Sequence, residues 1–184
     1  MGHVALVIDK APTTDRRTRT RSYDWGDPAE VQRAAAAGMA GLELLESIGA
    51  GRLPEPPALR TLGVEPVSAE PGKVVFALVP REYHYNPMGL VHGGVLVAIM
   101  DTAMGCAVHS HLGPGTGYVT TELTSQFLRP VNEQTGRIVC TGLAPSPESP
   151  SVTAVATIED AEGQVLATAT STCLVRSIGP ASST

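Results

Sequence analysis

The sequence contains little cysteine, little lysine and no apolar run long enough to span a membrane. Its three cysteines are widely spaced and include no CxxC pair, so we interpret them as reduced thiols of a cytoplasmic protein. Only 2 of its 13 basic residues are lysine and the formal net charge is −5, which argues against a broad nucleic-acid-binding surface. No stretch reaches the ~18 apolar residues that span a membrane, and no secretion signal is recognisable. We therefore expect a cytoplasmic protein that binds neither nucleic acid nor membrane.

What is present is a globular composition. The 184 residues, of which 42% are hydrophobic and 17% charged, suit one domain with flanking extensions. Composition predicts four parts: a disordered tail over residues 1–26, an N-terminal helix and Pro-rich connector over 27–57, the main domain over 58–176, and a flexible tail over 177–184. All the candidate functional residues named below lie in the third part.

The pattern of apolar residues predicts an α+β protein. Asp27 followed by Pro28 and Glu30 is a typical helix start, and the sequence after it predicts one helix that ends near Gly49. Alternation of apolar and polar residues, with Val, Ile and Thr abundant, predicts strands over 62–69, 73–80, 118–128, 136–143, 151–159 and 164–175.

Residues 94–109 follow a different pattern. They contain no proline and are almost entirely apolar, which is too long a run for one strand. Because the apolar surface extends all round, we predict a long helix that an antiparallel sheet covers on most sides. Asp101 is the only acid in this helix. An ionised carboxylate in such surroundings destabilises the fold unless it is hydrogen-bonded or paired with a charge. Asp101 therefore needs such a partner or a functional role.

The turn before this helix, His92-Gly93-Gly94, predicts a binding site for a polarised carbonyl oxygen. Backbone N–H groups of a first helical turn have no partners within the helix, and glycine lets a substrate approach them closely. Gly93 and Asp101 are eight residues apart, about 12 Å at roughly 1.5 Å per residue. One carbonyl group cannot contact both. If both serve one reaction, the carboxylate comes from a second copy of the chain, most simply across a two-fold axis.

The element order and one set of residues together resemble a known family. The residues are Asn86-Pro87, Gly89, His92-Gly93-Gly94, Asp101-Thr102-Ala103 and Phe127-Leu128-Arg129-Pro130. Over about residues 41–176 the chain resembles the hotdog-fold acyl-CoA thioesterases of the phenylacetate-degradation (PaaI-like) type. The resemblance implies an α+β hotdog fold, an antiparallel sheet wrapped around one long central helix, here with an N-terminal helical extension. It also implies a homodimer or a tetramer of two dimers, and no cofactor, since coenzyme A is part of the substrate.

The same resemblance implies a role for each matching residue. The amide of Gly93 polarises the thioester carbonyl with help from the Asn86 side chain. Asp101 of the neighbouring subunit activates water or attacks as a nucleophile, and the hydroxyl of Thr120, where relatives often carry Ser, assists it. His92 shapes the turn and interacts with the departing thiolate. Coenzyme A lies at a subunit interface.

Further binding candidates are weaker. Gly94 continues the open turn, Arg129 is a candidate for the coenzyme A phosphates or a single charge at a strand end, and His84 lines an acyl pocket or a strand edge. His109 and His111 lie two residues apart without further ligands at metal-binding spacing, so we interpret them as exposed loop histidines and expect no metal.

Simpler interpretations remain open for the same residues. A buried acid such as Asp101 can belong to a structural hydrogen-bond network, and Asn86 can simply form a turn. Two other functions are alternatives: a hotdog hydratase or dehydratase, which would pair a loop histidine such as His84 with the helix acid but does not match the His-Gly-Gly helix start, and a non-catalytic acyl-CoA-binding protein. The residues together favour a metal-free acyl-CoA thioesterase for a small, medium or aromatic acyl group.

Overall fold

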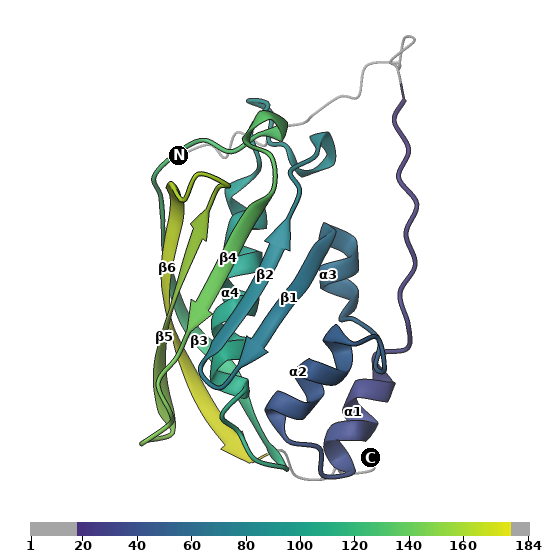
Figure 1. The fold of residues 1–184 in the computed structure, drawn as a ribbon, viewed down its shortest axis with the longest axis vertical. Helices are drawn as coiled ribbons and strands as arrows, with labels where there is room; N and C mark the ends of the chain where they lie inside the picture. The colour runs from purple at the N-terminus through teal and green to yellow at the C-terminus, as the bar shows by residue number, and fades with distance from the viewer. Residues whose placement is uncertain (1–17, 178–184) are drawn as a thin grey trace, which may run out of the picture.

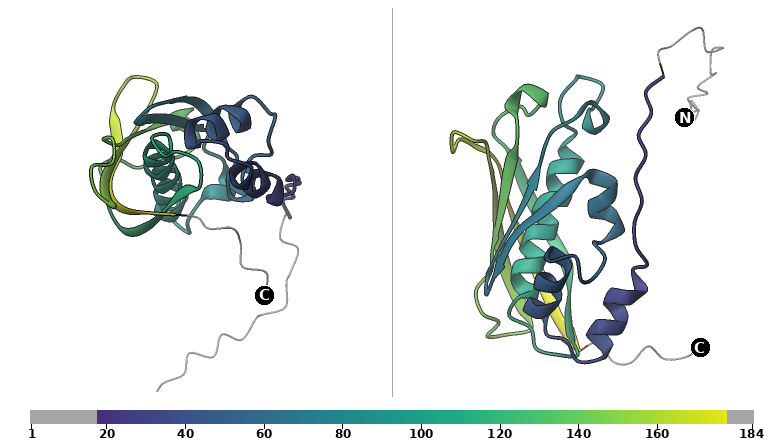
Figure 2. Two further views of the ribbon diagram at one scale, coloured as in Figure 1. Left: turned by 90° about the horizontal axis from the view of Figure 1, so that it is seen from below. Right: turned by 45° about the vertical axis from the view of Figure 1, so that its right-hand side comes forward.

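The computed structural model describes residues 18–177, and its centre is a six-stranded antiparallel sheet curled around helix α4 (Gly93–His109) (Figure 1). The strand order is β1-β2-β4-β5-β6-β3. The strands are β1 (Val64–Glu70), β2 (Lys73–Leu78), β3 (Thr116–Phe127), β4 (Ile138–Leu143), β5 (Ser151–Glu159) and β6 (Val165–Ser177). Viewed from below, the sheet encloses most of α4 (Figure 2). The predicted hotdog fold is confirmed.

The core lies between the concave face of the sheet and α4. In β5 every second residue from Val152 to Ile158 is buried, as expected of a strand with one face on a core. On α4 the side chains of Met100, Ala103 and Met104 are 0% exposed. Burial of the helix therefore comes from the sheet, which explains why its apolar surface extends almost all round.

One stripe of α4 is not covered. The edge strands β1 and β3 do not pair with each other, so the sheet stays open between them. Ala98, Asp101, Thr102 and Cys106 are only half-buried, whereas Ile99, Met100, Ala103 and Met104 are buried. The acid singled out in the sequence thus lies on the open stripe and not in the closed core.

The predicted elements of the main domain agree closely with the observed ones. Every predicted strand ends within two residues of an observed strand, and α4 begins one residue earlier than predicted. The earlier start has a local cause: the His92 side chain accepts a hydrogen bond from the Gly94 amide and so caps the helix. Two short 3₁₀ helices, η1 (Glu82–His84) and η2 (Glu133–Thr135), lie in the connecting loops.

The prediction of one continuous N-terminal helix is wrong. The segment forms two helices, α1 (Ala29–Ala36) and α2 (Gly41–Gly49). The chain turns at Gly38, whose φ of +97° favours glycine. The turn lets the start of α2 contact the end of α4, where a Cβ on Gly41 would lie 1.9 Å from the carbonyl oxygen of His109. Tertiary contact thus divides a segment whose local sequence favours one helix.

A third helix, α3 (Pro57–Leu62), was not predicted at all. Proline disfavours a helix interior but suits its first position, and Pro57 begins α3 in that way. Gly63 then ends the helix with a φ of +70°. The helix spans the predicted boundary between residues 57 and 58.

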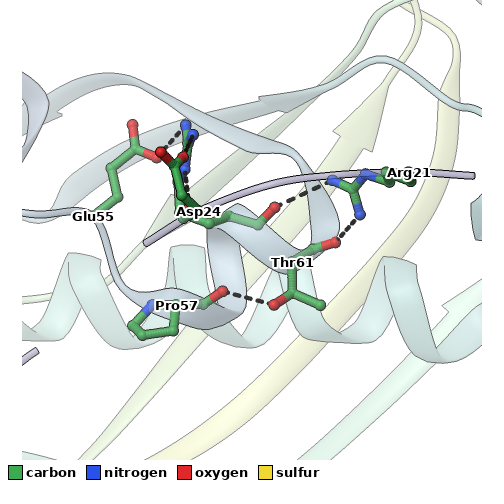
Figure 3. A network of polar contacts seen from close by, with 6 residues as sticks. Arg21, Asp24, Glu55, Pro57 and Thr61 are labelled. Carbon is green, nitrogen blue, oxygen red and sulfur yellow. Dashed lines mark hydrogen bonds and ion pairs between the residues drawn. The ribbon is translucent and has the colours of Figure 1, made fainter. Parts of the chain in front are cut away.

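Residues 18–26 form an extended segment beside α3 (Figure 1). The Arg21 guanidinium donates to the carbonyl oxygens of Arg60 and Thr61 at the C-terminal end of α3 (Figure 3). It also lies 4.0 Å from the ring centroid of Tyr83. Residues 1–17 and 178–184, which make up most of the two predicted tails, lie outside the described residues. Between residues 18 and 177, no helix is long and apolar enough to cross a membrane.

Candidate active site

Asn86 holds the turn that leads into α4. Its side-chain oxygen accepts hydrogen bonds from the amides of Met88 (2.9 Å) and Leu90 (3.3 Å). Its own amide donates to the Leu90 carbonyl oxygen at 2.7 Å, and Gly89 completes the turn with a φ of +75°. The side-chain NH₂ of Asn86 has no hydrogen-bond partner within residues 18–177. The oxygen of Asn86 therefore builds the turn and its NH₂ group is left to donate elsewhere.

The first two amides of α4 differ in their partners. The Gly94 amide donates to Nδ1 of His92 at 2.9 Å, so His92 acts as a helix cap. The Gly93 amide has no acceptor in the described part of the chain. A Cβ on Gly93 would lie 3.0 Å from Cζ of Phe127, whose ring therefore covers this position. Gly93 thus offers a free N–H donor beside an aromatic ring.

An open pocket of about 390 Å³ brings several candidates together. Asn86 and Gly93 line it from one side, and Phe127 and Arg129 line it from the end of β3. The Arg129 guanidinium donates through Nη1 to the carbonyl oxygen of Val165 at 2.6 Å. Two of the predicted carbonyl-polarising groups and the predicted phosphate-binding residue therefore share one pocket.

Asp101 has a partner on β3. The Thr120 hydroxyl donates to Oδ1 of Asp101 at 2.9 Å, and both residues are half-buried. Oδ2 of Asp101 makes no hydrogen bond within the described residues. Burial, with a smaller contribution from the Asp101 charge, raises the pKa of the neighbouring Cys106 thiol to about 12. The carboxylate is therefore oriented by one hydroxyl and keeps one oxygen free.

Within one chain these two groups of residues do not meet. Asp101 and Thr120 do not line the pocket that contains Asn86 and Gly93. Gly93 and Asp101 lie on the same helix, and eight residues of helix span about 12 Å. We call Asn86 and Gly93 of this pocket, together with the helix-capping His92, the turn half-site, and Asp101 with Thr120 the acid half-site.

The histidines outside the half-sites are bound to the backbone or buried. Nδ1 of His84 accepts from the Arg81 amide at 3.0 Å, so its Nε2 carries the proton and donates to the Leu62 carbonyl oxygen at 2.7 Å. Burial lowers its pKa. His84 lines neither the pocket that contains Asn86 and Gly93 nor the pocket that contains Thr102 and Cys106 of α4. Its assignment to substrate binding stays a prediction without a free ring nitrogen to support it.

The interpretation of His109 and His111 as exposed loop residues is wrong. His109 ends α4, and its Nδ1 is buried without a hydrogen bond in the described part of the chain. Burial lowers its pKa. His111 is half-buried and contacts the carbonyl oxygen of Ala144 at 3.2 Å. Among residues 18–177, no group of three potential ligands is placed to hold a metal ion.

Phe127 is the residue of this site whose position the sequence did not reveal. It was part of the quoted motif but had no assigned role. Phe127 is 52% exposed at the end of an edge strand, which is unusual for a large aromatic residue. This exposure marks Phe127 as a candidate contact residue, and it is visible only in the structure.

Comparison with known proteins identifies relatives of the chain. Residues 88–167 match the family model described as the thioesterase superfamily. The chain is 31% identical over 84 residues to a 1,4-dihydroxy-2-naphthoyl-CoA hydrolase of Listeria monocytogenes, an alignment that covers 46% of this chain and 67% of that protein.

Solved structures also resemble the chain. A phenylacetic acid degradation-related protein of Ralstonia eutropha superposes with a TM-score of 0.64 at 26% identity, over 71% of this chain and 98% of that one. The PaaI protein of the E. coli phenylacetic acid degradation operon has a TM-score of 0.60 at 22% identity, over 68% and 86% of the two chains. The latter likeness concerns the fold alone.

Proposed function

The chain belongs to the thioesterase superfamily and is a thioester hydrolase, and we propose that it cleaves acyl-CoA thioesters at a site shared by two copies of the chain. The observation that carries this proposal is that each half-site is incomplete. The turn half-site offers a free Gly93 N–H and no acid, and the acid half-site offers a free carboxylate oxygen and no carbonyl-polarising donor. Two copies related by a two-fold axis supply both to one substrate.

In the proposed mechanism, the thioester carbonyl oxygen accepts hydrogen bonds from the Gly93 amide and the Asn86 NH₂ group. These donors stabilise the negative charge that forms on this oxygen as the carbonyl carbon is attacked. His92 keeps the first turn of α4 in place by capping it. A backbone donor costs no reorganisation during the reaction, because the helix already holds it.

Asp101 of the second copy takes a proton from the attacking water. The Thr120 hydroxyl holds one carboxylate oxygen at 2.9 Å, so the other faces the substrate. The carbon–sulfur bond then breaks and coenzyme A leaves as a thiolate, which needs little help from an acid because a thiol is far more acidic than an alcohol. The Cys106 thiol is no competing nucleophile, since its raised pKa keeps it protonated.

The second copy has a place to dock on the edge of the sheet. The outer edge of β3 pairs with no other strand in residues 18–177, although the strand is 12 residues long. Val119 and Phe127 on this strand are 55% and 52% exposed. A long, partly apolar edge strand is a template for pairing with another chain. The further assembly of two dimers into a tetramer, and the cytoplasmic location, stay predictions.

Coenzyme A is proposed to reach the turn half-site from the side of Arg129. This residue lines the same pocket as Gly93. Only its Nη1 is bonded to the backbone, and the remaining guanidinium donors suit a phosphate. No cofactor is proposed.

The two rival functions receive less support. A hydratase that uses His84 needs a ring nitrogen free for proton transfer, and both ring nitrogens of His84 are bonded to the backbone. A non-catalytic binding protein has no need for the Thr120–Asp101 hydrogen bond or for the unused Gly93 donor.

Mixing two inactive variants tests the shared site. Asp101→Asn and Asn86→Ala are purified separately, exchanged in equal amounts, and assayed for free thiol release from a panel of acyl-CoAs. In a hybrid dimer one of the two sites contains both wild-type groups, so random exchange should restore about a quarter of the wild-type activity. Glu148→Gln, an exposed loop acid, serves as the control for general effects of acid removal. Confirmed hybrids that remain at the activity of the single variants would place both half-sites on one chain.

A further inference from the structure

We propose that the acyl chain of the substrate lies in the apolar pocket between α4, the N-terminal helices α2 and α3, and strands β1 and β2, and that this pocket selects unsubstituted acyl groups of medium length. We call it the helix pocket. The inference rests on the proposed function and identifies the substrate class of its site.

The helix pocket has the size and the lining of a site for an apolar ligand. Its volume is about 260 Å³. Most of its lining is apolar, with Leu45 and Ile48 from α2, Leu59 from α3, and Val74 and Phe76 from β2. Glu46 is its only charged residue and is exposed. An apolar cavity with few polar partners does not hold ordered water well, so an apolar group can occupy it at little cost.

The pocket begins beside the catalytic carboxylate. Thr102 and Cys106 of α4 form its wall on the helix side. Thr102 is the residue after Asp101, and the Cys106 thiol is close enough to Asp101 for the carboxylate charge to raise its pKa. Both residues belong to the half-buried stripe of α4 that the sheet leaves open. A thioester whose carbonyl carbon lies at Asp101 can therefore extend its acyl chain along this stripe into the helix pocket.

The polar atoms that α4 presents to the pocket offer little to a ligand. The Thr102 hydroxyl donates to the carbonyl oxygen of Ala98 at 2.8 Å, and the Cys106 thiol stays protonated and is a weak donor. A hydroxyl that lies against α4 would lose its hydrogen bonds to water and find no strong partner in exchange, and the other polar lining residues, Glu46 and Ser68, are exposed to solvent. The pocket should therefore discriminate against hydroxylated acyl groups.

The volume of the helix pocket limits the length of the acyl chain that it can hold. If each carbon takes roughly the 30 Å³ that one water molecule occupies, the pocket admits roughly eight carbon atoms. Octanoyl and phenylacetyl groups are of this size. The part of the pocket formed by α2, α3, β1 and β2 lies outside residues 88–167, the part that matches the family model. Acyl selection would thus come from a part of the chain separate from the common catalytic region.

The helix above the pocket is held by the segment before it. Arg21 donates to two carbonyl oxygens at the end of α3, and Asp24 pairs with Arg60 of the same helix at 3.2 Å (Figure 3). These contacts fix α3 over its side of the pocket, so the pocket does not depend on the packing of α3 alone.

The test measures kcat/KM against acyl length, from acetyl-CoA to dodecanoyl-CoA. Each added methylene should raise kcat/KM about fourfold, the equivalent of ~0.8 kcal/mol for burying one CH₂, until about eight carbons, and longer chains should gain nothing. Phenylacetyl-CoA should be preferred at least about tenfold over 4-hydroxyphenylacetyl-CoA. A flat length dependence or a preference for the hydroxylated substrate would overturn the proposal.

Two variants change the pocket in opposite directions. Ala69 lines it from β1, so Ala69→Leu should shift the optimum to shorter acyl chains, with a loss of about tenfold for octanoyl-CoA and a smaller loss for acetyl-CoA. Leu45→Ala should shift the optimum to longer chains. Ala161→Leu, in an exposed turn, is the matched control. An equal loss for all chain lengths in Ala69→Leu, together with an unchanged optimum in Leu45→Ala, contradicts the proposal.

Calorimetry separates this inference from the proposed function. Binding of acyl-CoAs of increasing length is measured on Asp101→Asn, alone and combined with Ala69→Leu. If wild-type protein hydrolyses no acyl-CoA but affinity still rises with length and Ala69→Leu shortens the optimum, the pocket assignment holds and the proposed function fails. If hydrolysis occurs and affinity does not depend on length, the pocket assignment fails alone.

Discussion

The two half-sites on α4 are built by different means. In the turn half-site, the Asn86 oxygen and the His92 ring hold the backbone through hydrogen bonds, and the donors left free are the Gly93 main-chain N–H and the Asn86 NH₂ group. In the acid half-site, a strand holds a side chain, and the group offered is a carboxylate oxygen. The turn half-site should therefore respond to changes of shape, whereas the acid half-site should respond to changes of charge.

The largest expected effect is the loss of charge in the acid half-site. Asp101→Asn keeps the size of the side chain and can still accept the hydrogen bond from Thr120, but it cannot take a proton from water. We expect kcat to fall by about 10²- to 10⁴-fold, the usual contribution of a general base. The measurement is initial rates of thiol release with an acyl-CoA at saturating concentration, beside wild type and Glu148→Gln. A fully active Asp101→Asn would show that the carboxylate is structural.

The next effect is a change of shape in the turn half-site. Gly93→Ala places a Cβ 3.0 Å from the Phe127 ring, so the ring must move and the approach to the Gly93 N–H narrows. We expect a loss of kcat/KM of about 10- to 100-fold, somewhat less than the 10²- to 10³-fold that follows removal of an oxyanion donor. Adding Phe127→Leu should restore part of it, because the smaller side chain relieves the contact.

A glycine elsewhere provides the control for this change. A Cβ on Gly113 would have no neighbour within 4 Å and its φ is not positive, so Gly113→Ala should behave as wild type. If Gly93→Ala is as active as Gly113→Ala, the turn half-site does not act through a close approach to the backbone.

The smallest effect should come from the residue that orients the acid. Thr120→Val removes the hydroxyl that donates to Asp101 and keeps the branched shape, so kcat should fall about tenfold with little change in KM. Thr120→Ser keeps the hydroxyl and should recover most of the activity. Recovery by Ser distinguishes orientation of Asp101 from a packing role. A loss in Thr120→Ser beside an unchanged Thr120→Val would mean that the methyl group, and not the hydroxyl, matters.

Much of the fold was predictable from local pattern. Alternating apolar residues predicted every strand because one face of each strand packs on the core, and the all-round apolar character of residues 94–109 predicted a helix inside a sheet. The residues of the half-sites were named from the motif and its resemblance. Their roles remain predictions, but Thr120 and Asp101 are in contact across 19 residues of sequence.

The N-terminal region was predicted less well, because its structure depends on distant contacts. Gly41 must be glycine because the His109 carbonyl lies against it, and nothing in the local sequence of α1 and α2 shows that approach. The prolines of residues 54–57 indicated an irregular connector, although the last of them, Pro57, begins α3. His109 was interpreted as exposed because it adjoins a loop, but α2 and Tyr118 cover it.

By itself, the sequence determined the central helix, the order of helices and strands along the main domain, the free amide at the start of the helix and the lone acid within it. Each of these depends on residue type and spacing along the chain, and the eight-residue spacing of Gly93 and Asp101 predicted two half-sites if both residues serve one reaction. Only the tertiary structure decided which oxygen of Asp101 is free, that Phe127 covers Gly93, and that α2 and α3 close an apolar pocket beside Thr102. These features arise where elements far apart in sequence meet, and the geometry of such contacts is set by packing and not by local pattern.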